Sequence, residues 1–253
     1  MNTISGLYLA ELVPVHIRAR AVGVSVACAN AVSVIATTVV WATERIDSPR
    51  QYKIPLWIQV AFPVALALLS LTVLESPTWY MVHNQEEKAR AVLMKLRRGS
   101  TEVVESEVRL LRIFVAQDKE RRQTAHFWNI LARENLQRTL TAGACLSISQ
   151  VGGQILVLAY STILLVQSGV SNPFQITVII FLAQFLGICI GPSLMDRYGR
   201  RPIGLAGFMI LFLLDVAIGG LASGGLSTNP ERVGLAALFI VFAFFNSMTF
   251  QSL

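Results

Sequence analysis

The loop Asp196-Arg197-Tyr198-Gly199-Arg200-Arg201-Pro202 combines a carboxylate, several guanidiniums and a glycine between two apolar stretches. An arginine can grip a carboxylate with two hydrogen bonds at once, so this loop has the chemistry of reversible charge pairing. Its glycine permits a tight turn. Basic residues beside an apolar stretch also serve as simple membrane anchors, but anchoring requires no Asp, Gly and Arg in this order.

Amide side chains form a second group of residues with usable chemistry. Gln150, Gln184 and Asn246 lie inside apolar stretches. A membrane excludes amides unless they face a water-filled cavity or another helix. Each amide is therefore either a hydrogen-bonding contact for a polar ligand or a bond between helices. Asp215 is the only acid well inside such a stretch, where ionisation costs roughly 2.5–3.5 kcal/mol.

Residues that could build a catalytic or metal site are scattered along the chain. The cysteines lie in separate apolar stretches without a CxxC pair, and the histidines lie in hydrophilic segments without HExxH spacing. We therefore expect no enzyme, no metal site, no disulfide framework and no cofactor. The residues concerned are Cys28, Cys145, Cys189, His16, His83 and His126.

The composition indicates which elements position these residues. Apolar residues make up 54% of the chain, charged residues only 14%, and the mean hydropathy is +0.58, which favours the bilayer as solvent. We expect an all-α fold, a polytopic membrane helical bundle of about six transmembrane helices. The expected spans lie near Ala21–Thr43, Ile54–Leu74, Leu140–Val166, Phe174–Met195, Ile203–Ala222 and Val233–Phe250.

One long hydrophilic stretch, from Glu75 to Arg138, interrupts the spans. It is rich in Lys and Arg, which predicts a cytoplasmic position by the positive-inside rule. Two runs of apolar residues recur in it at helical spacing with charges on the opposite face, which predicts short amphipathic helices. Such helices lie either on the lipid interface or beneath the bundle. The runs are Ala89, Val92, Leu93, Leu96 and Val104, Val108, Leu111, Val115.

The loop from Asp196 to Pro202 resembles the loop signature of the major facilitator superfamily. Tyr8-Leu-Ala-Glu11-Leu-Val-Pro14-Val-His-Ile-Arg18 resembles the sugar-porter motif between that superfamily's fourth and fifth helices, and Glu75-Ser76-Pro77-Thr78-Trp79 resembles the signature after the sixth. Gly6, Ala19 and Thr78 depart from the usual Pro, Gly and Arg of these motifs. The chain thus resembles the sugar porter family, of a fungal-type sugar or α-glucoside permease kind.

The resemblance implies a partial major facilitator fold. Residues 1–74 would hold the tail of the fourth helix with the fifth and sixth, residues 75–138 the intracellular helical linker, and residues 139–253 the seventh to tenth helices. It therefore predicts a fragment that cannot transport alone. It also implies charge pairs that latch the inner gate in one state and separate in the other. The implied gating residues are Glu11, Arg18, Glu75, Arg197, Arg200 and Arg201.

The resemblance also implies a substrate site. In the seventh helix Gln150, Gly153 and Tyr160 match the family's sugar contacts, while Ser149, Ile155 and Ala159 replace others, which argues against a common hexose. Gln184 in the eighth helix and Asn246 in the tenth complete the predicted site. Asp215 invites a proton-coupling role, but its surroundings match no coupling motif and the family's usual coupling acid belongs to the first helix.

The expected function is transport of a sugar or sugar-like polyol by alternating access, with or without proton coupling. The alternatives are a non-transporting membrane sensor and a drug-efflux member of the same superfamily. A drug exporter would share the Asp196–Pro202 loop but not the other two motifs. The expected partners are the substrate and the lipid bilayer, with no nucleic acid, and the expected location is the plasma membrane.

Overall fold

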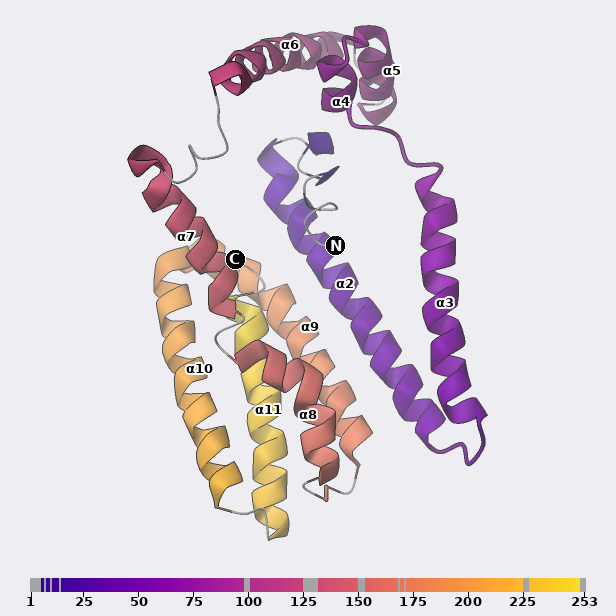
Figure 1. Cartoon of the computed structure of the whole chain (residues 1–253), viewed down its shortest axis with the longest axis vertical. Helices are drawn as coiled ribbons and strands as arrows, with labels where there is room; N and C mark the ends of the chain where they lie inside the picture. The colour runs from indigo at the N-terminus through magenta and orange to yellow at the C-terminus, as the bar shows by residue number, and fades with distance from the viewer. Residues whose placement is uncertain are drawn as a thin grey trace. The chain divides into compact units, whose positions relative to one another are not determined.

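The computed structural model of the chain describes residues 6, 8–9, 11–13, 15–97, 101–124, 132–149, 153–167, 169–170, 172–224 and 228–250. Over these residues the chain forms helices and turns and no strand, which confirms the expected all-α fold (Figure 1). Two compact units divide it. Unit 1 comprises Met1–Val22 and Phe62–Leu140, and unit 2 comprises Gly23–Ala61 and Thr141–Leu253. The predicted boundaries after residues 74 and 138 stay predictions.

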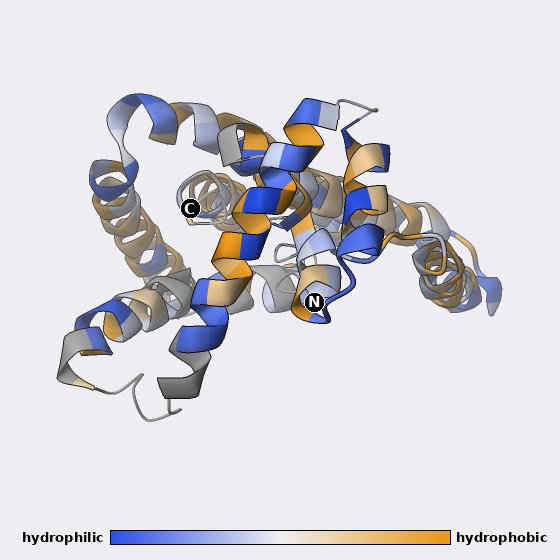
Figure 2. Cartoon of the chain, turned by 90° about the horizontal axis from the view of Figure 1, so that it is seen from above, coloured by the Kyte–Doolittle hydropathy of each residue, from blue (hydrophilic) through white to orange (hydrophobic). Residues whose placement is uncertain are grey.

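Five helices of the described residues are long and apolar enough to cross a membrane. They coincide with five of the expected spans, so the chain is an integral, multi-pass membrane protein. In Figure 2 hydrophobic colouring dominates these helices. The apolar side chains of α3 are exposed along its length, as suits a surface that faces lipid. The helices are α2 (Val15–Glu44), α3 (Arg50–Ser70), α9 (Pro173–Tyr198), α10 (Arg200–Ser223) and α11 (Asn229–Thr249).

The sixth expected span, Leu140–Val166, contains two described α-helices. These are α7 (Arg133–Ser149) and α8 (Ile155–Gln167); residues 150–152 lie outside the described part, and Gly153 and Gln154 directly before α8 are π-helical. Gly153 has a φ of 78°, a left-handed conformation that glycine adopts readily. A glycine at this position therefore allows the backbone to depart from regular α-helical geometry directly before α8.

The hydrophilic stretch of unit 1 folds into α4 (Pro77–Val82), α5 (Glu86–Leu96) and α6 (Thr101–Thr124). Ser76 caps α4, because its hydroxyl accepts a hydrogen bond from the amide of Thr78 at 3.2 Å and Pro77 suits the first helical position. The three helices pack on one another, which confirms the predicted amphipathic helices. Their buried apolar side chains are Met81, Ala89, Val92, Leu93, Val104 and Val108.

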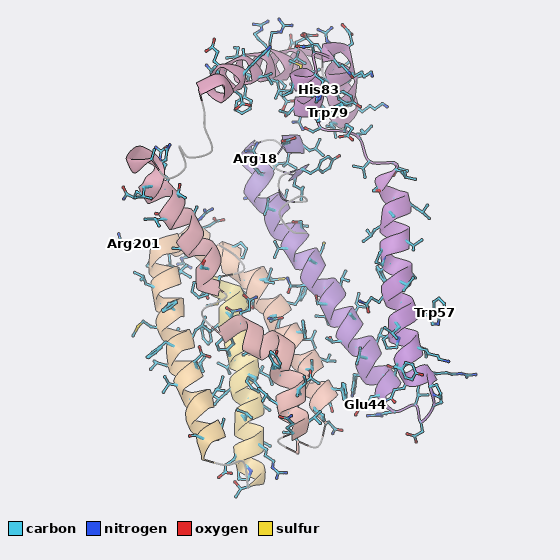
Figure 3. The ribbon with its side chains drawn as sticks, in the orientation of Figure 1. Arg18, Glu44, Trp57, Trp79, His83 and Arg201 are labelled. Atoms are coloured by element: carbon cyan, nitrogen blue, oxygen red, sulfur yellow. The ribbon has the colours of Figure 1, made fainter. Side chains whose placement is uncertain are left out.

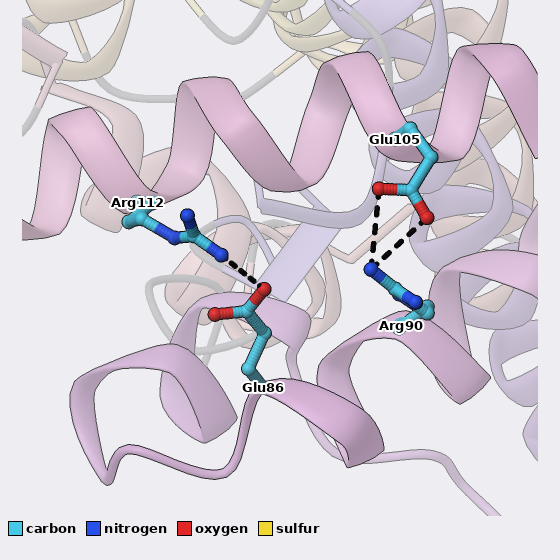
Figure 4. A network of polar contacts seen from close by, with 4 residues as sticks. All are labelled: Glu86, Arg90, Glu105 and Arg112. Atoms are coloured by element: carbon cyan, nitrogen blue, oxygen red, sulfur yellow. Dashed lines mark hydrogen bonds and ion pairs between the residues drawn. The ribbon is translucent and has the colours of Figure 1, made fainter.

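Ion pairs join the charged faces of α5 and α6. Arg97 holds Glu107 with two hydrogen bonds, of 2.9 Å from Nε and 2.6 Å from Nη2. This hydrogen bonding raises the pKa of Arg97 above its usual value, against the effect of burial. Figure 4 shows the two other pairs, Arg90 with Glu105 at 3.0 Å and Arg112 with Glu86. These pairs fix how α5 and α6 align over their shared apolar core.

We expect Arg97→Met to lower the stability of the α5–α6 contact by about 1 kcal/mol, because the ion pair with Glu107 is mostly shielded from water. Arg112→Met is the matched control, since Arg112 is 65% exposed and a surface pair contributes little. Hydrogen–deuterium exchange of α5 and α6 amides measures the difference. Equal protection in the two variants would contradict this ranking.

Unit 2 places α9, α10 and α11 side by side, with α8 against α9 and α11 (Figure 1). Their shared core includes Leu165, Ile180 and Phe242. α9 and α11 approach closely at Gly187 of α9, where an added Cβ would lie 2.6 Å from the Phe244 carbonyl oxygen of α11. Small residues allow such backbone contact between membrane helices.

Candidate functional site

The motif from Tyr8 to Arg18 and the motif from Glu75 to Trp79 meet within unit 1. The hydroxyl of Tyr8 donates a hydrogen bond to the Leu74 carbonyl oxygen, and the hydroxyl of Ser76 donates one to the Glu11 carboxylate. Burial, and then the neighbouring Glu75 carboxylate, raise the pKa of Tyr8. Ser76 thus both caps α4 and holds Glu11, a role that its place between two motif residues did not reveal.

The predicted gating residues of unit 1 do not pair with one another in the described structure. Glu11 and Glu75 are exposed, and Arg18 is half-buried with its Nε lacking a hydrogen-bond partner. Figure 3 marks Arg18 near the start of α2. An unpartnered buried guanidinium N–H costs free energy, so Arg18 has capacity for a further hydrogen bond.

The predicted gating residues of unit 2 lie where α9 turns into α10. Gly199 has a φ of 87° and separates the two helices. Arg197 lies over the ring of Tyr198 at 5.6 Å from its centroid, while Arg200 and Arg201 are exposed in the first turn of α10. Figure 3 labels Arg201. All three guanidiniums are therefore accessible to carboxylates. Because the gating residues divide between the two units, the network itself stays a prediction.

Two predicted substrate contacts are enclosed in the helix bundle of unit 2. Gln184 of α9 is 2% exposed and Asn246 of α11 is 1% exposed. Among the described residues, the Nε2 of Gln184 and both amide atoms of Asn246 have no hydrogen-bond partner. Gln184 lies one turn before Gly187, and Asn246 precedes Ser247, which Gly187 approaches closely. Both amides therefore belong to the α9–α11 contact.

A third unpartnered polar group, the hydroxyl of Ser161 on α8, is also fully buried. Sequence reasoning selected its neighbour Tyr160, which is 50% exposed. Successive helical residues point about 100° apart, so the two side chains occupy different faces of α8. The polar run Tyr160-Ser161-Thr162 was the signal, but it did not tell which member is buried. Gln150 lies outside the described residues, and the roles of Gln150 and Tyr160 stay predictions.

Gly153 and Asp215 lie against each other. An added Cβ on Gly153 would stand 3.0 Å from Oδ1 and 3.1 Å from Oδ2 of Asp215. The glycine directly before α8 and the acid inside α10 therefore form one local arrangement. Sequence reasoning placed Gly153 in the site and left Asp215 out, because the surroundings of Asp215 match no coupling motif.

The chemistry that the buried amides of Gln184 and Asn246 offer is hydrogen bonding. Buried amides without partners can donate to and accept from hydroxyl groups, and they offer no nucleophile. Among the described residues no group of three or more His, Cys, Asp or Glu side chains could hold a metal ion.

The whole chain, residues 1–253, matches the family described as "Sugar (and other) transporter". It is 28% identical to the MFS transporter fmqE of Aspergillus fumigatus over 95% of this chain and 45% of that protein. It is 31% identical to the alpha-glucosides permease MPH3 of Saccharomyces cerevisiae over 80% of this chain and 34% of that protein. The chain thus spans less than half the length of these relatives.

Among solved structures, the chain resembles a partially occluded inward-open conformation of the xylose transporter XylE from E. coli. The TM-score is 0.76 at 18% identity, over 98% of this chain and 52% of that one. This similarity supports the partial major facilitator fold, and the family groups transporters rather than enzymes. The chain belongs to the sugar (and other) transporter family.

Proposed function

We propose that this chain forms part of a transporter that moves a sugar or sugar-like polyol across the plasma membrane by alternating access. The observation that carries the proposal is the set of buried, unpartnered amide atoms of Gln184 and Asn246 between α9 and α11. Native proteins seldom leave such atoms unsatisfied without a functional reason. A polyhydroxylated substrate supplies the hydroxyl groups that these amides lack.

Alternating access explains how a substrate reaches enclosed side chains. Transporters of this architecture bind substrate near the bilayer midplane and expose the site by moving helices against one another. We infer that a shift of α11 against α9 opens Gln184 and Asn246 to water and substrate. The Gly187 contact permits such a shift because it carries no side chain that locks the two helices together.

The substrate class follows from the site and from the relatives. Ser149, Ile155 and Ala159 stand where family members carry sugar contacts, so the site offers fewer hydrogen bonds to a hexose. One relative is named as an alpha-glucosides permease. We therefore place α-glucosides and polyols ahead of simple hexoses.

Radiolabelled uptake by the whole gene product tests the proposal. The panel holds hexoses, α-glucosides and cyclic polyols, each measured over a concentration series in a host without competing transporters. Saturable uptake of at least one compound is the expected result. No saturable uptake across the panel, with normal membrane expression, would overturn the proposal in favour of a sensor or a drug exporter.

We also propose that the charges at the cytoplasmic helix ends latch the inner gate. Arg201→Ala should shift the transporter toward its inward-open form and reduce uptake several-fold, because about 1 kcal/mol of lost pairing changes a population roughly fivefold. Arg50→Ala is the matched control, since Arg50 is an exposed arginine in the first turn of a spanning helix outside the motif. Unchanged uptake in Arg201→Ala at normal surface expression would contradict the latch.

A further inference from the structure

Ser161 on α8 is buried in an apolar environment. Its side chain is 0% exposed, and its hydroxyl has no hydrogen-bond partner among the described residues. Val157 and Leu165, one turn before and one turn after it, belong to the core that α8 shares with α9 and α11. Residues four apart lie on the same helix face, so Ser161 faces that core as well. The serine therefore places a hydrogen-bonding group among apolar side chains.

Two other buried hydroxyls of the same bundle are satisfied within their own helix. Ser247, also 0% exposed, donates to the Ala243 carbonyl oxygen at 2.7 Å, and Thr249 donates to the Phe245 carbonyl oxygen at 2.7 Å. A helical serine commonly makes this bond to the carbonyl four residues earlier. Ser161 makes no such bond, and a buried hydroxyl without a partner costs free energy. Its hydroxyl is therefore available to a partner from outside the helix.

The contact between α8 and α9 fixes how far Ser161 lies from the buried amides. The hydroxyls of Thr162 and Thr177 are 2.8 Å apart, so the residue after Ser161 is level with Thr177 of α9. Gln184 follows Thr177 by seven residues, which places it on the same face and about 10 Å further along the helix axis. Ser161 therefore lies about 10 Å from the level of Gln184, on the side away from the Asp196–Pro202 loop.

One face of α11 joins these two levels. Phe239, Phe242 and Asn246 recur on it at helical spacing, and none of them is more than 2% exposed. The two phenylalanines share a core cluster with Leu165, the residue one turn after Ser161. This face thus runs from the surroundings of Ser161 to Asn246. The shift of α11 that the proposed function requires would open both levels together.

We propose that Ser161 is a specificity-determining residue, whose hydroxyl bonds the far end of a substrate that Gln184 and Asn246 hold at its near end. This inference rests on the proposed function. A pyranose ring built from bonds of about 1.5 Å extends about 3 Å from its centre to a hydroxyl oxygen. A hydrogen bond of about 2.8 Å then leaves a ring centred at the amides short of Ser161.

A second ring closes this gap. A glycosidic bond places the second ring centre about 5 Å beyond the first, which brings its outer hydroxyls within hydrogen-bonding reach of Ser161. The hydroxyl of Ser161 therefore favours substrates of two linked rings over substrates of one ring. Its burial among apolar side chains strengthens this preference, because a substrate too short to reach it leaves the hydroxyl unpaired.

Uptake of two matched probes by the whole gene product tests the assignment. Methyl α-glucoside has one glucose ring, and maltose has two. Ser161→Ala should raise the KM for maltose roughly tenfold and change the KM for methyl α-glucoside by less than about twofold, because only the second ring reaches the lost hydroxyl. Gln184→Leu should raise both KM values. Ser33→Ala, which removes an α2 hydroxyl bonded to the Ala29 carbonyl oxygen at 3.2 Å, should change neither.

A second variant separates hydrogen bonding from packing. Ser161→Cys keeps the shape of the side chain but donates only weakly, so it should raise the KM for maltose as Ser161→Ala does. Both variants should unfold at an unchanged or higher temperature, since each removes a buried hydroxyl without a partner. An unchanged KM for maltose in Ser161→Cys would show that size rather than hydrogen bonding matters at this position, which overturns the inference.

The remaining outcomes distinguish this inference from the proposed function. Equal KM changes for the two probes in Ser161→Ala, or no change for either, overturn the role of Ser161 alone. Saturable uptake of other sugars or polyols without uptake of maltose by the unchanged protein also overturns it and leaves the transport function standing. No saturable uptake of any compound removes the proposed function and the inference together.

Discussion

Gly187→Ala should destabilise the bundle of unit 2 by about 3 kcal/mol or more, at the upper end of what overpacking costs. The added methyl would stand 2.4 Å from the Ser247 hydroxyl, 2.6 Å from the Phe244 carbonyl oxygen and 3.1 Å from the Met248 amide nitrogen. The hydroxyl can rotate, but the backbone atoms cannot move without separating α9 from α11. Thermal unfolding in detergent, followed by loss of monodisperse protein, measures the effect.

Gly234→Ala is the matched control, because Gly234 lies on α11 and an added Cβ there meets nothing within 4 Å. Replacing a helical glycine by alanine in open space normally stabilises by roughly 0.5–1 kcal/mol. The two variants should therefore change stability in opposite directions. A stable Gly187→Ala protein would show that α9 and α11 do not approach as closely as described.

Gln184→Leu and Asn246→Leu should each reduce substrate uptake roughly tenfold, which corresponds to about 1.4 kcal/mol of lost binding. The folded protein should lose no stability, because each change removes buried amide atoms that have no hydrogen-bond partner among the described residues. Uptake kinetics and thermal unfolding of the same preparations give the two numbers. Loss of uptake without loss of stability indicates a substrate contact, whereas loss of stability indicates a hydrogen bond between helices.

Thr177→Val on α9 is the control for a buried polar group that does have partners. The Thr177 hydroxyl contacts the Thr162 hydroxyl at 2.8 Å and donates to the Pro173 carbonyl oxygen at 2.9 Å. We expect this variant to lose about 1 kcal/mol of stability, with a smaller effect on uptake than either amide variant. If the leucine variants instead lose stability and keep their uptake, Gln184 and Asn246 hold helices together and bind no substrate.

The sequence predicts those parts of the fold that depend on local pattern. Hydropathy locates α2, α3, α9, α10 and α11 because a span needs a continuous apolar run. Helical spacing of residues such as Ala89 and Val92 predicts α5 and its buried face, since one face of each amphipathic helix must leave water.

The remaining features depend on backbone conformation or on contacts between distant residues. The left-handed conformation of Gly153 concerns the backbone of one residue, to which a hydropathy window is insensitive. Two contacts join residues far apart in the chain: Asp215 lies against Gly153, and the Ser76 hydroxyl donates a hydrogen bond to the Glu11 carboxylate. The polarity of a span indicates that Gln184 and Asn246 matter, but only packing tells that their amides lack partners.

The most direct measurement is an experimental structure of the whole gene product with the transported substrate bound. We predict density for the substrate with its hydroxyl groups within about 3.2 Å of the Gln184 and Asn246 amide atoms. The opposite result would be a substrate bound elsewhere, with both amides hydrogen-bonded to neighbouring helices. In that case the buried amides of α9 and α11 would hold the bundle together and would not form a sugar site.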